Sequence, residues 1–271
     1  MPILNKDMTL CISLSGRPSN IGTRFHNYLY EELGLNFIYK AFSTDDLAGA
    51  IAGVRALGIR GCSVSMPFKE DVMALVDTIE PSAAAIDSVN TIVNTDGHLS
   101  ASNTDFEAIA TLIGRHELDP SANVLVRGSG GMAKAVVAAF RDAGFENLTV
   151  LARNIAAGGA LAQKYGYAFI DADPEPGHQA LVNVTPLGMD GEQAAIQSFS
   201  DAQIAAAETV FDVVAFPSET PLVAAAREHG KQVITGAEVI ALQAAAQFEK
   251  YTGHGLSEDQ VIRASEFSRH Q

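Results

Sequence analysis

Short apolar runs alternate with amphipathic stretches through the N-terminal third of the chain, and this alternation predicts an α/β fold. The strand-like runs lie at 10–14, 37–42 and 62–65. Between them, 23–33 and 45–57 carry apolar residues at helical spacing, which is typical of helices that cover a sheet. Strands separated by helices indicate βαβ units and a largely parallel sheet.

The helix expected over 45–57 has recognisable signals at both ends. Ser43 and Thr44 precede it, and a hydroxyl at a helix start can accept a hydrogen bond from a free backbone N–H group. Gly58 follows its last apolar residue, a common place for the glycine that ends a helix. We therefore expect either hydroxyl to be the cap of this helix.

A second α/β block begins near Ala122 and repeats the alternation. Its expected strands lie at 124–126, 148–151, 180–184, 210–214 and 232–234. Its expected helices lie at 133–143, 237–251 and 257–267, and the segment at 171–177 is expected to be a surface loop. For a chain of 271 residues, two domains are the natural expectation, since one core of this length is unusual.

The composition narrows the class of partner. A hydrophobic fraction of 47% with 18% charged residues is typical of a folded globular protein. The net charge of −14 argues against nucleic acid and against an anionic membrane surface, because no basic stripe exists to neutralise phosphates. The N-terminus resembles no signal peptide and no apolar stretch is long enough to span a bilayer, so we expect a cytoplasmic protein.

The two cysteines, Cys11 and Cys62, each lie in an apolar run. Buried, reduced thiols are the expectation for such positions in a reducing compartment. The chain lacks the paired cysteine and histidine spacing of metal sites, so we expect no metal.

The segment 124–135 joins a strand-like run to a helix-like run through a glycine-rich turn. The turn has the pattern G-x-G-G-x-A, a variant of the dinucleotide-binding fingerprint. In that fingerprint the first glycine permits the tight turn, the second lets the backbone approach a pyrophosphate, and the small last residue lets helix and strand pack closely. Free N–H groups at the helix start would bind the phosphates. The candidate cofactor-binding residues here are Gly128, Ser129, Gly130, Gly131, Met132 and Ala133. An ordinary βα turn remains the alternative.

The end of the second strand of this block indicates which dinucleotide is preferred. NAD-selective sites place an acidic residue there to hold the ribose 2′-hydroxyl. This chain has Arg153 instead, and a planar guanidinium can bind a 2′-phosphate with two hydrogen bonds. We therefore expect NADP, with NAD as the alternative cofactor, although Arg153 could also be a solvated surface residue.

Three polar motifs in the N-terminal third contain side chains that a catalytic site needs. They lie at 63–70, 88–93 and 102–105. Taken singly, each has a structural explanation. Lys69 could be a surface lysine, Asn90 a turn residue, and Asp105 the N-cap of a helix over 106–116.

Together, these motifs resemble the shikimate/quinate dehydrogenase family, whose pattern is close to N-V-T-x-P-F-K, A-V-N-T and N-T-D, followed by a glycine-rich loop. Further elements in the family's order lie at 16–18, 25–27, 183–189, 212, 220–221 and 242–248. The resemblance implies an N-terminal α/β substrate-binding domain over 1–104, completed by C-terminal helices at 237–271. It also implies a Rossmann-type NAD(P)-binding domain over 105–236. The implied activity is oxidation of a secondary hydroxyl of shikimate, quinate or a related cyclic hydroxy acid.

The resemblance assigns Lys69 and Asp105 as the catalytic pair. A lysine in a poorly solvated cleft can accept the hydroxyl proton while hydride leaves for the nicotinamide. The expected task of Asp105 is to orient Lys69 and bind the substrate hydroxyl. The implied substrate ligands also include Ser65, Asn90 and Gln243, and the implied cofactor ligands include Asn183, Thr185 and Gly236. Ala157 stands where the family has a second phosphate-binding arginine, so we expect the preference for NADP to be modest.

The positions that bind the substrate carboxylate depart from the family. Asn20 and Gly22 match its S-x-S pair, and Ala215 matches a tyrosine. Ser15 and Arg17 lie nearby in the sequence and, with Asn20, are the candidate replacements. The pattern resembles the divergent shikimate dehydrogenase-like subgroup, for which we expect weak activity on shikimate.

Two other classes of function remain as alternatives. One is a ligand-binding or regulatory homologue without turnover, which the retention of Lys69, Asn90 and Asp105 disfavours. The other is a two-domain enzyme of the methylene-tetrahydrofolate dehydrogenase class, which the motifs at 88–91 and 102–105 disfavour. We expect a monomer or a homodimer.

Overall fold

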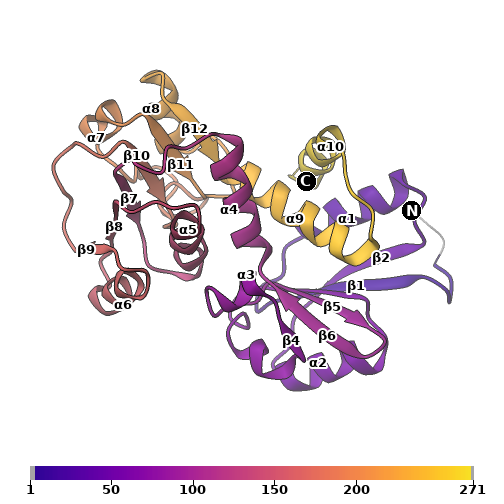
Figure 1. Cartoon of the computed structure of the whole chain (residues 1–271). Helices are drawn as coiled ribbons and strands as arrows, with labels where there is room; N and C mark the ends of the chain where they lie inside the picture. The colour runs from indigo at the N-terminus through magenta and orange to yellow at the C-terminus, as the bar shows by residue number, and fades with distance from the viewer. Residues whose placement is uncertain (1–3, 270–271) are drawn as a thin grey trace. The chain divides into compact units, whose positions relative to one another are not determined.

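Figure 1 shows the computed structural model of the chain, which describes residues 4–269. Contacts within the chain divide it into two compact units. Unit 1 comprises residues 1–104 and 241–271, and unit 2 comprises residues 105–240. The chain therefore leaves the first unit once and returns to it at its C-terminal end.

Unit 1 is built on one six-stranded sheet with the order β2-β1-β3-β5-β6-β4. Its strands are β1 (Thr9–Leu14), β2 (Phe37–Phe42), β3 (Gly61–Val64), β4 (Thr78–Ile79), β5 (Thr91–Thr95) and β6 (His98–Ser102). The three strand-like runs of the sequence are confirmed as β1, β2 and β3, and β1 runs parallel to both of its neighbours.

The expectation of a largely parallel sheet needs correction at β5, which runs antiparallel to both β3 and β6. A two-residue turn, Asp96-Gly97, joins β5 to β6, and its φ angles are +52° and +88°. Positive φ at both central residues is the geometry of tight hairpin turns. The unit 1 sheet is therefore mixed, with a hairpin beside the parallel strands.

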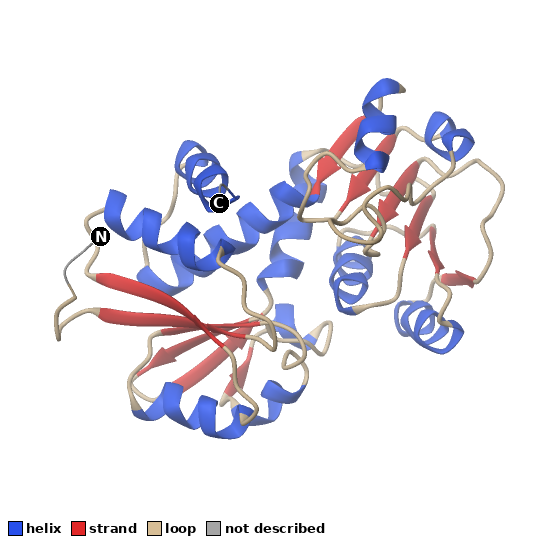
Figure 2. Cartoon of the chain, turned by 180° about the vertical axis from the view of Figure 1, so that it is seen from behind, coloured by secondary structure: helices blue, strands red, loops and turns tan. Residues whose placement is uncertain are grey.

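Helices cover both faces of this sheet (Figures 1 and 2). They are α1 (Ile21–Glu32), α2 (Leu47–Ala56), the 3-10 helix η1 (Asp71–Leu75), α3 (Pro81–Ala84), α9 (Gly236–Thr252), which begins in unit 2, and α10 (Glu258–Arg269). The cap of α2 is Asp46, whose carboxylate accepts a 2.8 Å hydrogen bond from the N–H of Gly49. The expectation that Ser43 or Thr44 caps this helix is therefore wrong. The Thr44 hydroxyl instead accepts a hydrogen bond from the N–H of Asp46.

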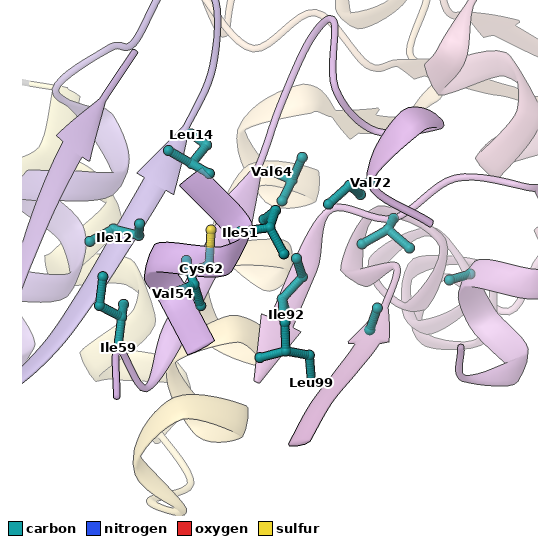
Figure 3. Close-up of a cluster of buried hydrophobic side chains, with 13 residues drawn as sticks. Ile12, Leu14, Ile51, Val54, Ile59, Cys62, Val64, Val72, Ile92 and Leu99 are labelled. Atoms are coloured by element: carbon teal, nitrogen blue, oxygen red, sulfur yellow. The ribbon is translucent and has the colours of Figure 1, made fainter. Parts of the chain in front are cut away.

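Strand periodicity divides the core of unit 1 between the two faces of the sheet. Ile12 and Leu14 pack with Cys62 in the cluster beneath α2, which Figure 3 shows. Cys11 points to the other face and packs with Leu29 and the other apolar residues of α1 and α9. Both thiols are free and buried, and burial raises the pKa of Cys11 to about 11. The two cysteines thus belong to separate clusters.

Unit 2 has a six-stranded sheet with the order β12-β11-β10-β7-β8-β9, in which every pairing is parallel. Its strands are β7 (Val124–Arg127), β8 (Leu148–Leu151), β9 (Ala168–Ile170), β10 (Ala180–Asn183), β11 (Thr209–Asp212) and β12 (Gln232–Thr235). The five strands expected in this block are all present, and β9 is a strand that the pattern does not predict.

The helices of unit 2 are α4 (Thr104–Arg115), α5 (Gly131–Asp142), α6 (Ile155–Tyr165), α7 (Asp201–Ala206) and α8 (Pro221–Glu228). In Figure 1, α5 and α6 lie on one face of the sheet, and α7 and α8 lie on the other. The order of the strands reverses between β7 and β10. In doubly wound sheets, ligands bind beyond the carboxyl ends of the strands at this switch point.

Candidate active site

The glycine-rich turn after β7 has a backbone that only glycine tolerates at its first position. Gly128 has a φ of +127°, and a Cβ atom there would lie 2.7 Å from Cγ2 of Val184. Gly130 is the N-cap of α5, and a Cβ atom on it would meet nothing within 4 Å. The turn therefore leaves open space beside the first N–H groups of a helix, where phosphate groups bind readily.

A cavity of about 690 Å³ adjoins this turn at the switch point between β7 and β10. Its lining residues lie at 127–130, 151–154, 171, 173 and 184–187. Five of the expected cofactor residues are on its wall: Gly128, Ser129, Gly130, Arg153 and Thr185. A volume of this size is typical of sites for small molecules and cofactors.

Other residues expected to bind the cofactor are not among the lining residues of this cavity. Gly131 and Met132 form the first turn of α5, and Ala133, also in that turn, is fully buried. Gly236 begins α9, where a Cβ atom would lie 2.2 Å from the carbonyl oxygen of Val214. Only glycine fits there, which is a structural reason for its identity.

Asn183 is also outside this lining, and its side chain is buried and fully engaged. Its Nδ2 donates to Asp212 Oδ1 (2.9 Å) and to the carbonyl oxygen of Leu187 (3.2 Å). Its Oδ1 accepts from the N–H and the hydroxyl of Thr185 (3.1 and 2.6 Å). Asn183 therefore holds the loop after β10 in place, and that loop forms one wall of the cavity.

Two arginines line the cavity, and the sequence motifs predicted only one of them. Arg153 is exposed just beyond the end of β8, and Asn154 caps α6 by accepting a 3.0 Å hydrogen bond from the N–H of Ala157. Arg127, the last residue of β7, forms an ion pair with Asp173. A charge at the end of an otherwise apolar strand is the signal that could have identified it.

In unit 1, backbone hydrogen bonds bring the three polar motifs together. The N–H of Val64 donates to the carbonyl oxygen of Asn90, and the N–H of Val89 donates to that of Lys69, both at 2.8 Å. The N–H of Asn90 donates to the carbonyl oxygen of Ser102 at 3.1 Å. Asn90 thus lies between the motif at 63–70, which contains Lys69, and the motif at 102–105, which leads into α4.

The Asn90 side chain, which is 3% exposed, is oriented by its oxygen atom. Oδ1 accepts hydrogen bonds from the Thr91 hydroxyl (2.7 Å) and from the N–H and hydroxyl of Thr104 (2.8 and 3.1 Å). Nδ2 has no hydrogen bond to any residue that the structure describes. Asp105 follows Thr104 directly in the first turn of α4 and is 8% exposed. The amide group of Asn90 can therefore donate to a ligand while its oxygen fixes the start of this helix.

Two glutamines of α9 complete this network. Gln243 Nε2 donates to the Thr104 hydroxyl at 3.3 Å. Gln247 Nε2 donates to the Thr91 hydroxyl (2.9 Å) and to the carbonyl oxygen of Asn90 (3.2 Å). The sequence assigned a site role only to Gln243. Gln247 lies in a recognised motif, but no local signal showed that it contacts Asn90.

The residues expected to bind the substrate carboxylate in place of the family's serines and tyrosine differ in their burial and hydrogen bonding. Ser15 is buried, and its Oγ has no hydrogen-bond partner within residues 4–269. Arg17 and Asn20 are exposed, and Asn20 precedes α1 without a side-chain capping bond. Ser65 is exposed, and its N–H donates to the carbonyl oxygen of Leu14, next to Ser15. Ser15 and Ser65 are thus neighbours on adjacent strand ends.

Two negative findings apply to the residues that the structure describes. They contain no group of three or more histidine, cysteine, aspartate or glutamate side chains that could hold a metal ion. Among the same residues, no helix has the length and apolar character needed to cross a membrane.

A doubly wound parallel sheet with a glycine turn at its switch point defines a dinucleotide-binding α/β protein. A family model described as "Shikimate dehydrogenase substrate binding domain" matches residues 20–92, which lie within unit 1. The chain belongs to the shikimate dehydrogenase family, as its similarity to full-length relatives shows.

Three relatives show the extent of this similarity. A shikimate dehydrogenase-like protein of Haemophilus influenzae is 56% identical over 268 residues, which cover 98% of this chain and 99% of the relative. A shikimate dehydrogenase (NADP(+)) of Chlorobaculum tepidum is 36% identical, with 87% of each chain covered. The solved structure of shikimate 5-dehydrogenase from Thermus thermophilus, in complex with NADP(H) and shikimate, superposes with a TM-score of 0.86 at 27% identity, covering 96% of this chain and all of that one.

Proposed function

We propose that this chain is an NADP-dependent oxidoreductase that transfers hydride between the cofactor and a secondary hydroxyl or ketone of shikimate, quinate or a related cyclic hydroxy acid. The observation that carries the proposal is the bonded network around Asn90, which joins the backbone of Lys69 to Thr104 and so to Asp105. The names of the relatives, shikimate dehydrogenase (NADP(+)) among them, support the same reaction class.

The cavity of unit 2 fits a dinucleotide phosphate. Gly128 permits the tight turn, Gly130 leaves open space for a pyrophosphate, and the start of α5 supplies free N–H groups. Arg153 is on the cavity wall at the position where a 2′-phosphate is distinguished from a hydroxyl. When bound, NADP would supply the acceptor for a hydride from the substrate carbon.

Lys69, Asn90 and Asp105 would carry the chemistry at the substrate. We assign to the Lys69 amine the role of accepting the proton of the reacting hydroxyl as hydride leaves. Asn90 would donate through its Nδ2 to a substrate oxygen, since this amide has no other acceptor among the described residues. Asp105 would orient Lys69 and accept a hydrogen bond from the substrate.

Carboxylate recognition is the part of the site that differs from the family pattern. A buried carboxylate needs several charge-assisted hydrogen bonds to offset its desolvation. Ser15 offers a buried hydroxyl that has no hydrogen-bond partner among residues 4–269, whereas Arg17 and Asn20 are exposed. We therefore propose that shikimate is turned over with a higher KM or a lower kcat than is usual for the family.

A steady-state assay tests this function. The protein is incubated with shikimate or quinate and with NADP+ or NAD+, and the absorbance of the reduced nicotinamide is followed, with the hydroxy acid omitted as the control. We expect substrate-dependent reduction of NADP+. Calorimetric binding of shikimate or quinate without turnover of either cofactor would contradict the proposal and favour a ligand-binding homologue.

A further inference from the structure

Arg127 is a charged residue in an unusual place, the last position of a strand whose other residues are fully buried. Its side chain is 17% exposed, and it immediately precedes Gly128 of the phosphate-binding turn. Arg127 lines the dinucleotide cavity and also a neighbouring cavity of about 590 Å³. Arg127 therefore contributes to the lining of both cavities.

Two contacts fix the orientation of this planar guanidinium group. One is the ion pair with Asp173, whose carboxylate offsets the positive charge. The other is the ring of Phe199, whose centroid lies 4.9 Å from the guanidinium carbon. Phe199 lines the neighbouring cavity but not the dinucleotide cavity. Arg127 thus contacts the Phe199 ring and also lines the cavity that a dinucleotide would occupy.

The register of the sheet relates Arg127 to the residue expected to bind the 2′-phosphate. Arg127 pairs with Leu151 across β7 and β8, and Arg153 lies two residues beyond Leu151. In NADP the 2′-phosphate and the adenine are attached to neighbouring carbons of one ribose. A phosphate held by Arg153 would therefore bring the base toward the adjacent strand end, where Arg127 lies.

We propose that Arg127 is the stacking platform for the adenine ring of the bound dinucleotide, an inference that rests on the proposed cofactor. Planar guanidinium groups stack on aromatic faces, and the Phe199 ring already supports one side of this group. Because Asp173 offsets the charge of Arg127, the group suits a neutral base better than a second phosphate. Arg127 then sets affinity for both dinucleotides, and Arg153 sets the choice between them.

Dissociation constants of purified variants, measured by calorimetry, test this division of roles. The ligands are NADP+, NAD+ and ADP-ribose, which share the adenine, and nicotinamide mononucleotide, which lacks it. Arg127→Leu should weaken the three adenine ligands by a similar factor, about tenfold, and leave the mononucleotide unchanged. Arg153→Ala should weaken NADP+ selectively. Asp173 is 61% exposed, so removal of its partner buries no unpaired charge and the Leu variant should fold.

Arg127→Lys is the matched variant, because it keeps the charge and the pairing with Asp173 but loses the planar face. We expect it to bind the adenine ligands as weakly as the Leu variant does. Three results would overturn the assignment of Arg127 as the stacking platform. The first is wild-type affinity in Arg127→Lys, and the second is a loss of affinity in Arg127→Leu that is confined to NADP+. The third is unchanged binding in both variants. Failure of the wild type itself to bind NADP+ and NAD+ would instead refute the proposed cofactor site, and thermal melting of each variant verifies that it is folded.

Discussion

At the scale of single residues, we propose that the preference for one dinucleotide over the other depends on Arg153. Its side chain is exposed on the cavity wall, and Ala157 provides no second cation. We predict that Arg153→Ala raises the dissociation constant of NADP+ by about tenfold, because one charge-assisted contact to phosphate is lost. The dissociation constant of NAD+ should change little. Isothermal titration calorimetry with NADP+ and with NAD+ measures the two effects.

Arg227→Ala is the matched control for this experiment. Arg227 is an exposed arginine of α8 that pairs with Glu219 and lies outside the cavity lining. Its removal should leave both affinities as in the wild type. A wild-type preference for NAD+ that Arg153→Ala does not alter would show that this arginine is a solvated surface residue.

Sequence reasoning proposed candidate site residues that lie in contiguous motifs, such as Gly128, Lys69 and Asn90. It did not identify residues whose roles depend on distant partners. Arg127 contacts a carboxylate 46 residues away, and Gln247 contacts the Asn90 backbone across 157 residues. Such contacts follow from the fold, so no local pattern could have predicted them.

At the scale of elements, the strands were predictable because both the buried runs and the turns that separate them have clear patterns. The β5–β6 hairpin was missed although the sequence contains its signal. Asp96-Gly97 is the type of dipeptide that two-residue hairpin turns require. The motif at 88–93 overlaps the start of β5, and the motif at 102–105 begins at the last residue of β6, so the two polar motifs lie at the same end of the hairpin.

The junction between β12 and α9 depends on one glycine. A Cβ atom on Gly236 would lie 2.2 Å from the carbonyl oxygen of Val214, and main-chain atoms cannot move aside as a flexible side chain can. We predict that Gly236→Ala lowers the free energy of unfolding by at least about 2 kcal/mol, within the range of overpacking substitutions. Urea unfolding followed by circular dichroism measures this change.

Gly159→Ala provides the comparison, since Gly159 lies within α6 and an added Cβ atom would meet nothing within 4 Å. This substitution should stabilise the protein by roughly 0.5–1 kcal/mol through the better helix propensity of alanine. Equal stability of the two alanine variants would contradict the steric account of Gly236.

At the scale of the whole molecule, a buried histidine makes stability sensitive to acid. His26 is fully buried and stacks on Tyr39, with ring centroids 4.4 Å apart, and burial lowers its pKa from 6.5 to about 3. Below pH 6.5 the unfolded chain binds a proton that the folded chain excludes. Stability is therefore lost as the pH falls toward 3, with a slope of up to about 1.4 kcal/mol per pH unit from this residue.

We predict that His26→Phe, which keeps an aromatic ring in the cluster, makes the free energy of unfolding less dependent on pH between 6.5 and 3. Urea unfolding across that interval measures the slope. His229→Phe is the matched control, because that ring is exposed at the end of α8. A slope in the His26 variant as steep as in the wild type would show that other groups cause the acid sensitivity.

The most direct test of the proposed reaction is the comparison of wild type with Lys69→Ala. Loss of a general base typically lowers the rate by ~10²–10⁴-fold. We therefore predict a fall of that size in kcat with shikimate or quinate, whereas the dissociation constant of NADP+ stays the same. Lys6→Ala, at an exposed position of unit 1, should retain full activity. Equal kcat values in wild type and Lys69→Ala would contradict the assignment of Lys69 as the proton acceptor.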